Sequence, residues 1–286
     1  MVLTRSRSQS QLDHFAARWV PVTLAGVAGL LWLSNAGWKV PPEFGETADR
    51  CSGLCGFVAA GIEDPVVPGS RWILDTIVQP NLALFGWLTL FVEATLAALL
   101  LSRRFLRTAA VLGVAQSLAI GLTVANAPDE WYWAYLLMIA LHLAVLGYAA
   151  VLRPVRPRTM ATAAGLYGVV VAIAHAEAGF GGDGNDTWTV FTGGNDVPDE
   201  FGRGTFPGSI ALGVLLVGLA VVAWRLAGTD RRVRTTSGWA SVALSAILLV
   251  TYDSSGLVIG LGSRAANAAV LAALGLTLAR PTPDDT

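Results

Sequence analysis

Charged side chains are scarce in this sequence of 286 residues, and lysine is nearly absent. Only 14% of the residues are charged, whereas 54% are hydrophobic. Soluble domains carry roughly a quarter charged residues, so much of this surface cannot face water. Lys39 is the single lysine among 19 basic residues, a preference for arginine that is typical of a GC-rich bacterial genome. The composition predicts an integral membrane protein.

Motifs for soluble cofactors are also missing. The glycine-rich segments 179–184 and 193–194 have no expected strand before them and no helix opening after them, so they are not phosphate-binding loops. Two cysteines with no histidine nearby do not make a metal site. We therefore expect neither a metal nor a bound nucleic acid.

Eight apolar segments are long enough to cross a hydrocarbon core of about 30 Å, which takes about 20 helical residues. They are 19–38, 81–102, 108–125, 131–152, 159–178, 208–227, 237–257 and 264–280. Backbone polar groups in lipid must bond within their own segment, and the apolar runs are continuous and not alternating, so helices are expected and not barrel strands. The expected fold is an all-α membrane protein with about eight transmembrane helices.

The basic residues predict the orientation of these helices. If the amino terminus is cytoplasmic, 14 of the 19 basic residues fall on the cytoplasmic side, and the outer loops 39–80 and 179–207 are acidic. Most tryptophans lie near expected helix ends, as in an interfacial belt. We expect a multi-pass protein of the cell membrane, surrounded by the lipid bilayer, with both termini cytoplasmic.

An offset of 127 residues suggests an internal repeat. It superposes Arg104 on Arg231 and Arg153 on Arg280 without a gap. The expected halves are 1–158 and 159–286, each with four helices and one large outer loop, and an even helix count implies parallel repeats. Recurring arginine clusters in any membrane protein of this orientation are the alternative explanation.

Three polar residues fall at similar depth on neighbouring expected helices: Glu93, Gln116 and His142. Ionisable groups in lipid are costly, so Glu93 and His142 are candidate catalytic residues and Gln116 a candidate ligand-binding residue. The alternative is that the three bond one another and hold the bundle together. The repeat-related position of each is alanine, which would confine the site to the first half.

Lys39 follows the first expected helix on the outer side, where basic residues are rare. It is a candidate ligand-binding residue that either binds an anion or pairs with an inward acidic group; snorkelling to the interface is the alternative. His142 and His175 as a haem pair are not favoured, because their expected depths differ by roughly 10 Å at 1.5 Å per residue.

Cys51 and Cys55 lie in the first outer loop, where an oxidising compartment favours a disulfide. A regular helix would hold cysteines four residues apart too far from each other, but Gly53 allows a tighter turn. The pair is expected to be a structural clip, with a redox-active dithiol as the alternative. The spacing is not the C-x-x-C of thioredoxin-like folds.

The first half resembles DoxX-like membrane proteins over residues 19–152. The likeness rests on the segment 30–39, LLWLSNAGWK, and on the segment 88–93, LTLFVE, followed by a leucine-rich run to the arginine pair 103–104. The resemblance implies a four-helix membrane bundle and points to Lys39 and Glu93. The family includes subunits of a thiosulfate:quinone oxidoreductase and members linked to thiol-redox complexes. The cysteine loop and the four additional helices depart from that pattern.

The leading functional hypothesis is a membrane subunit of a quinone- or thiol-linked oxidoreductase. Quinone would enter from the lipid, and a redox partner protein would dock at the outer face. The alternatives are a transporter or lipid-binding protein, and a structural or assembly protein without a small-molecule site. Broken helices or inverted repeats would favour the transporter.

Labelling of introduced cysteines tests the orientation. A cysteine replacing Arg156 should react with an impermeant maleimide only from the cytoplasmic side, because positive residues are retained there. One replacing Asp183 should react only from outside. Outside labelling at position 156 would contradict the topology.

Overall fold

The computed structural model shows a chain built of helices with one very short strand pair. It describes residues 7–37, 39, 44, 46–47, 50–51, 53–127, 130, 132–180, 206–250 and 263–280. Most of the second outer loop, expected at 179–207, lies outside these ranges, so the loop proposed there stays a prediction. The expected all-helical class is confirmed.

Long helices occur at all eight positions expected from the apolar runs. They are α1 (Arg7–Gly37), α4 (Leu82–Ser102), α5 (Leu106–Val124), α6 (Tyr132–Tyr148), α7 (Pro157–Phe180), α9 (Phe206–Leu226), α10 (Arg231–Val250) and α11 (Arg264–Leu278). Among the described residues, four stretches are both long and apolar enough to cross a membrane: Trp19–Gly37, Ser70–Ser102, Leu106–Val124 and Arg231–Val250. The other four positions hold shorter apolar helical stretches, so eight crossings remain a proposal.

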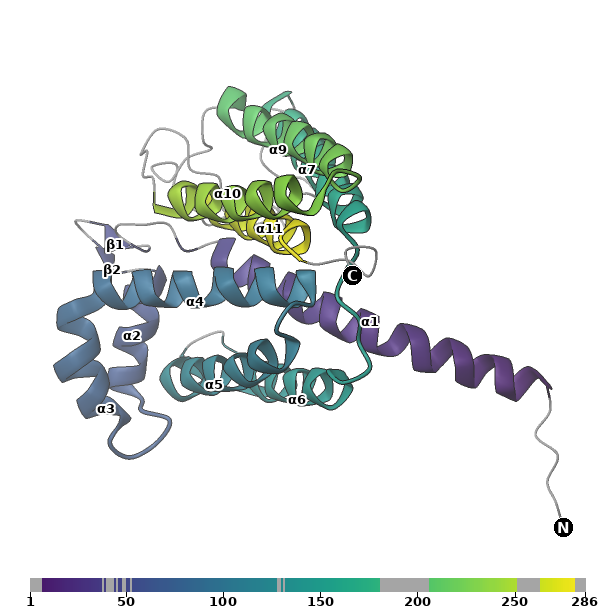
Figure 1. Ribbon diagram of the computed structural model, residues 1–286. Helices are drawn as coiled ribbons and strands as arrows, with labels where there is room; N and C mark the ends of the chain where they lie inside the picture. Colours follow the sequence, from purple (N-terminus) through teal and green to yellow (C-terminus); the bar gives the residue numbers. More distant parts are fainter. Residues whose placement is uncertain are drawn as a thin grey trace, which may run out of the picture.

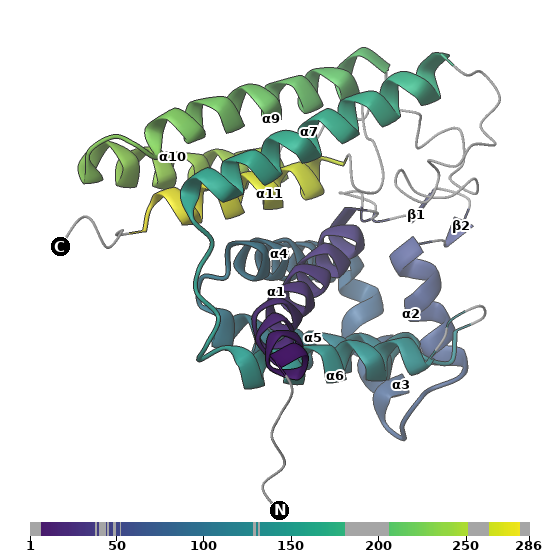
Figure 2. The same cartoon turned by 90° about the vertical axis from the view of Figure 1, so that its right-hand side faces the viewer.

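The helices pack in layers (Figure 1). The pair α7–α9 lies on the pair α10–α11, and α4 lies below α11, followed by α5 and α6. Helix α1 crosses between α4 and α6, as the rotated view also shows (Figure 2). Helix α11 contacts α4, α7 and α1, and most of its side chains are buried. The shortest of the expected spans is therefore central to the packing.

Glycines let these helices approach closely. A Cβ added to Gly238 on α10 would lie 2.5 Å from the backbone nitrogen of Ala279 and 2.7 Å from the oxygen of Gly275. The pair α7–α9 uses Gly168 and Gly213 in the same way, because a Cβ on either would meet the other's backbone oxygen at 2.8 Å. Membrane helices without a hydrophobic driving force associate through such small residues.

The segment between α1 and α4, expected to be the first outer loop, holds more helix than the sequence indicated. It contains α2 (Gly53–Glu63), α3 (Ser70–Ile73), a π-helical turn η1 (Leu74–Val78) and a 3-10 turn η2 (Gln79–Asn81) that leads into α4. In Figure 1, α2 and α3 lie at one end of the bundle and turn away from α4. Within η2, Pro80 lacks a backbone N–H, and the Asn81 side chain donates to the oxygen of Ile77 at 2.8 Å.

Apolar packing explains why this segment is helical and not an open loop. Leu54 and Val58 are buried on one face of α2. Gly61 brings α2 against α5, since a Cβ there would lie 2.2 Å from the oxygen of Thr123. A search for membrane spans does not find α2, because its apolar run is too short to cross a membrane.

A two-stranded ribbon connects α1 to α2. Strands β1 (Glu46–Thr47) and β2 (Arg50–Cys51) pair antiparallel, with Glu46 opposite Cys51. Just before the ribbon, Phe44 is fully buried. Its ring lies edge-on to the Trp87 ring, with 5.6 Å between the ring centres. A Cβ on Gly86 would overlap the Phe44 ring. Phe44 therefore fixes the start of the segment between α1 and α4 to the first two turns of α4. This contact lies about two helical turns before Glu93.

The internal repeat stays a prediction. Both halves pair their helices in the same order, α1 with α4 and α5 with α6, then α7 with α9 and α10 with α11. The expected divisions at 1–158 and 159–286 stay a prediction, and α7 begins two residues before the second of them. Helix α11 joins the halves by packing on α4, so the second half rests against the helix that carries Glu93.

Candidate functional site

A buried ion pair joins Lys39, just beyond α1, to Glu93 in the middle of α4. The Lys39 Nζ lies 2.7 Å from the Glu93 Oε2, and the two side chains are 3% and 0% exposed. Lys39 also donates to the backbone oxygen of Asn35 at 3.0 Å. The sequence left three roles open for Lys39, and in the structure it pairs with an inward acidic group. Buried charges are tolerated only with such partners.

The sequence of α4 explains why Glu93 faces inward. Leu90, Ala97 and Leu100 are buried on the same helix, and they lie three, four and seven residues from Glu93. Residues at this spacing share one helix face. Helix α1 packs on that face, and its end places Lys39 over the carboxyl.

The second carboxylate oxygen of Glu93 has no hydrogen bond of standard geometry to any described residue, although it is buried. The side chain of Gln116, on α5, comes near enough to interact with the carboxyl. Lys39, Glu93 and Gln116 are therefore brought together as the sequence suggested. A buried oxygen that accepts no bond is costly, so Oε1 can accept a hydrogen bond from a ligand.

His142, on α6, belongs to a separate buried arrangement. Its Nε2 accepts a hydrogen bond from the Trp32 Nε1 at 2.8 Å, and its Nδ1 lies 2.6 Å from the backbone oxygen of Met138. A ring that accepts at Nε2 and donates at Nδ1 is the neutral tautomer, assigned here from its partners. Gly113 provides the space, because a Cβ there would overlap the ring.

Both ring nitrogens of His142 are thus engaged, which changes its expected role. No hydrogen bond in the described part of the chain joins His142 to Glu93, Gln116 or Lys39. Iron ligation would require one of these nitrogens, and the side chain of His175 lies outside the described part. The His142 ring packs against Trp32 and accepts its indole N–H. We therefore do not include His142 among the catalytic residues in the proposal below.

Sequence reasoning missed Trp32 and the backbone oxygen of Asn35. Trp32 lies seven residues before Lys39, which is two helical turns. The two polar contacts therefore extend along one side of α1, from His142 to Glu93. The seven-residue spacing could have indicated Trp32, because it puts a second polar group on the Lys39 side of the helix. A buried indole N–H needs an acceptor.

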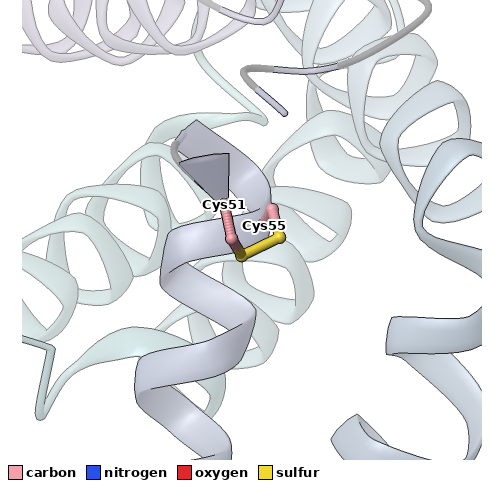
Figure 3. Close-up of a disulfide and its surroundings, with 2 residues drawn as sticks. All are labelled: Cys51 and Cys55. Atoms are coloured by element: carbon pink, nitrogen blue, oxygen red, sulfur yellow. A yellow bond between two sulfur atoms is a disulfide. The ribbon is translucent and has the colours of Figure 1, made fainter. Parts of the chain in front are cut away.

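The cysteines form a disulfide in the segment between α1 and α4 (Figure 3). Cys51 lies in β2 and Cys55 in the first turn of α2, with their Cα atoms 5.1 Å apart. Gly53 between them has a φ of 54°, a left-handed conformation that glycine adopts without strain. Cys51 is exposed, whereas Cys55 is 6% exposed. No group of metal-binding side chains occurs among the described residues.

A double-mutant cycle tests the buried pair. Lys39→Met or Glu93→Gln alone leaves a polar partner without its counterpart, and should lower stability by about 3–5 kcal/mol. The double variant should lose much less than the sum, as measured by unfolding in detergent. Effects that add within about 0.5 kcal/mol would show that the two groups do not interact.

The chain matches none of the family models, curated proteins or solved structures with which it was compared. The likeness of residues 19–152 to DoxX-like proteins stays an expectation. The functional argument below therefore starts from the Lys39–Glu93 pair and the disulfide.

Proposed function

We propose that this chain is a membrane subunit of an oxidoreductase system, and that the Lys39–Glu93 pair binds the head group of a quinol or quinone. The observation that carries the proposal is the buried Oε1 of Glu93. A quinol hydroxyl is a donor that reaches the membrane interior with an apolar body. It can donate the well-aligned hydrogen bond that this oxygen does not receive from the described residues.

The pair can also move a proton. Lys39 compensates the charge of the carboxylate, so Oε1 accepts a hydrogen bond from the quinol hydroxyl. When the quinol loses an electron, the hydroxyl proton passes to this oxygen, as in general base catalysis. In the reverse direction the same carboxyl returns a proton to the reduced quinone oxygen. The electrons pass to or from a redox partner protein, proposed at the outer face.

The acceptor role differs from what the sequence alone would suggest for Glu93. An isolated carboxyl in lipid would be neutral and would donate a hydrogen bond to a quinone carbonyl. With the Lys39 ammonium at 2.7 Å from one carboxyl oxygen, the proposal gives the other oxygen the acceptor role. Lys39 and Glu93 are also the two positions to which the DoxX-like resemblance points, which supports assignment to that kind of subunit.

The proposal includes eight membrane crossings with both termini in the cytoplasm. In support, the connections that follow α4 and α6 lie together, because Val155 N–H donates to the oxygen of Ser102 at 3.1 Å. Both connections are rich in arginine. The elements of the first outer loop lie at the opposite end of α4 (Figure 1).

Quinone binding to variants of Glu93 tests the proposal. Glu93→Ala removes the acceptor and should weaken binding of a short-chain quinol by about 10–100-fold, the range for a hydrogen bond to a charged group. Glu93→Gln keeps an acceptor oxygen but cannot take up a proton, so binding should persist while quinol oxidation is lost. Fluorescence titration and a quinol oxidation assay with an artificial electron acceptor measure these two effects.

Ser117→Ala is the matched control. Its hydroxyl is buried on α5 but donates to the oxygen of Gly113, so the substitution should leave quinol affinity unchanged. Equal affinity per folded molecule in the unaltered protein and all variants would refute the site. Binding without any quinol oxidation in the unaltered protein would favour the lipid-binding alternative.

Thiol–disulfide exchange is a second candidate function, favoured by the unequal exposure of the two cysteines. A thiolate on a partner protein can reach the exposed Cys51, form a mixed disulfide with it and release Cys55 as a thiolate. Cys55 lies in the first turn of α2, where helix N–H groups stabilise negative charge. A second thiol of the partner then displaces Cys51, so two electrons pass from the partner dithiol to the pair.

Trapping with oxidised glutathione distinguishes exchange from a structural clip. In Cys55→Ser, the exposed Cys51 should form a glutathione adduct at least about tenfold faster than Cys55 does in Cys51→Ser, because access limits the reaction. Mass spectrometry follows the adducts, and a glutathione buffer tests whether the native pair can be reduced. A bridge that stays oxidised in reduced glutathione would support the structural clip alone.

A further inference from the structure

The turn between α4 and α5 holds the side chain of Arg104 at the arginine-rich end of the bundle. The backbone N–H of Arg104 donates to the Ser102 Oγ at 3.3 Å. The Arg104 Nη1 donates to the backbone oxygen of Leu276, near the end of α11, at 2.8 Å. Because the guanidinium is already positioned, a ligand that binds it loses little side-chain entropy.

A second positive charge lies close to the first. Burial lowers the pKa of Arg104, and repulsion from Arg280, just beyond α11, lowers it further. In the described ranges, no carboxylate forms an ion pair with either arginine. Asp230, the carboxylate before α10, instead caps that helix by accepting from the backbone N–H groups of Arg232 and Val233. Two cations that repel each other are stabilised when an anion binds between them.

Exposed aromatic rings adjoin this charge. The Arg104 Cζ lies 5.7 Å from the centre of the Trp239 ring and 5.3 Å from that of Phe105. The two aromatic residues are 50% and 60% exposed. Phe105 directly precedes α5, and Trp239 follows the basic first two turns of α10. Aromatic rings beside such a basic end contact the head-group region of the bilayer. A ligand for this surface therefore has a negative charge and an apolar body, which free phosphate lacks.

We infer that the surface formed by Arg104, Arg280, Trp239 and Phe105 binds an anionic phospholipid. Its phosphate lies against the two guanidinium groups, which suit the planar, two-point contact that arginine makes with phosphate. Its glycerol and the start of its acyl chains lie over the two rings. This site is separate from the Lys39–Glu93 pair, and it stands whether or not that pair binds quinone.

Native mass spectrometry of the full-length protein in neutral detergent tests the inference. Phosphatidylglycerol should be retained in preference to phosphatidylcholine. Arg104→Gln and Arg280→Gln should each weaken phosphatidylglycerol binding about fivefold, which corresponds to about 1 kcal/mol per basic residue at a lipid surface. Phosphatidylcholine binding should not change. Arg280 is exposed, so its variant remains informative if Arg104→Gln folds poorly.

Arg156→Gln is the matched control, because Arg156 is an exposed arginine in the α6–α7 connection at the same end of the bundle. It should leave lipid binding unchanged. Equal retention of the two lipids, or a loss in Arg156→Gln as large as in Arg280→Gln, would overturn the inference. Displacement of the lipid by millimolar inorganic phosphate would assign the site to free phosphate instead of lipid.

Discussion

The ion pair between Lys39 and Glu93 is the interaction on which the first half depends. Neither charge can be buried alone without a cost of several kcal/mol. The pair therefore fixes the end of α1 against the middle of α4. Asn35 contributes its backbone oxygen to the ammonium, and the Trp32–His142 contact lies two turns earlier on the same helix. Together these contacts set both the rotation and the axial position of α1.

Close backbone contacts complete the packing. Gly29 lets α1 approach Leu101 of α4, Gly86 makes room for Phe44, and Gly113 makes room for His142. Each of these glycines lies where a side chain from another element must fit: a leucine beside Gly29, and a ring beside Gly86 and Gly113. These three side chains hold their positions because a larger residue in place of each glycine would collide with them.

The helical class and the positions of the long helices could be predicted from the sequence because an apolar run of about 20 residues has few other outcomes. Glu93, Gln116 and Lys39 could be found because a polar group in such a run is conspicuous. Their grouping was harder to predict. His142 has the same apparent depth as Glu93, but its hydrogen bonds go to Trp32 and Met138, since depth along a helix does not determine the direction of a side chain.

The helices between α1 and α4 could not be predicted from hydropathy either. Helix α2 is too short to resemble a membrane span, and its position depends on the contact of Gly61 with Thr123, far along the chain. The turn at Gly53 was correctly read from glycine's conformational freedom, because its φ is positive. The central place of α11 could not be predicted from its length, because the burial of a helix depends on how many other helices pack against it.

The ionisation state of Glu93 is the central claim, and infrared difference spectroscopy measures it directly. The spectrum of the purified protein is compared with that of Glu93→Gln near neutral pH. The account predicts that Glu93 contributes carboxylate bands and no protonated-acid carbonyl band, and that Lys39→Met brings the protonated band out. A protonated-acid band from Glu93 in the unaltered protein would contradict the ion pair and the acceptor role built on it.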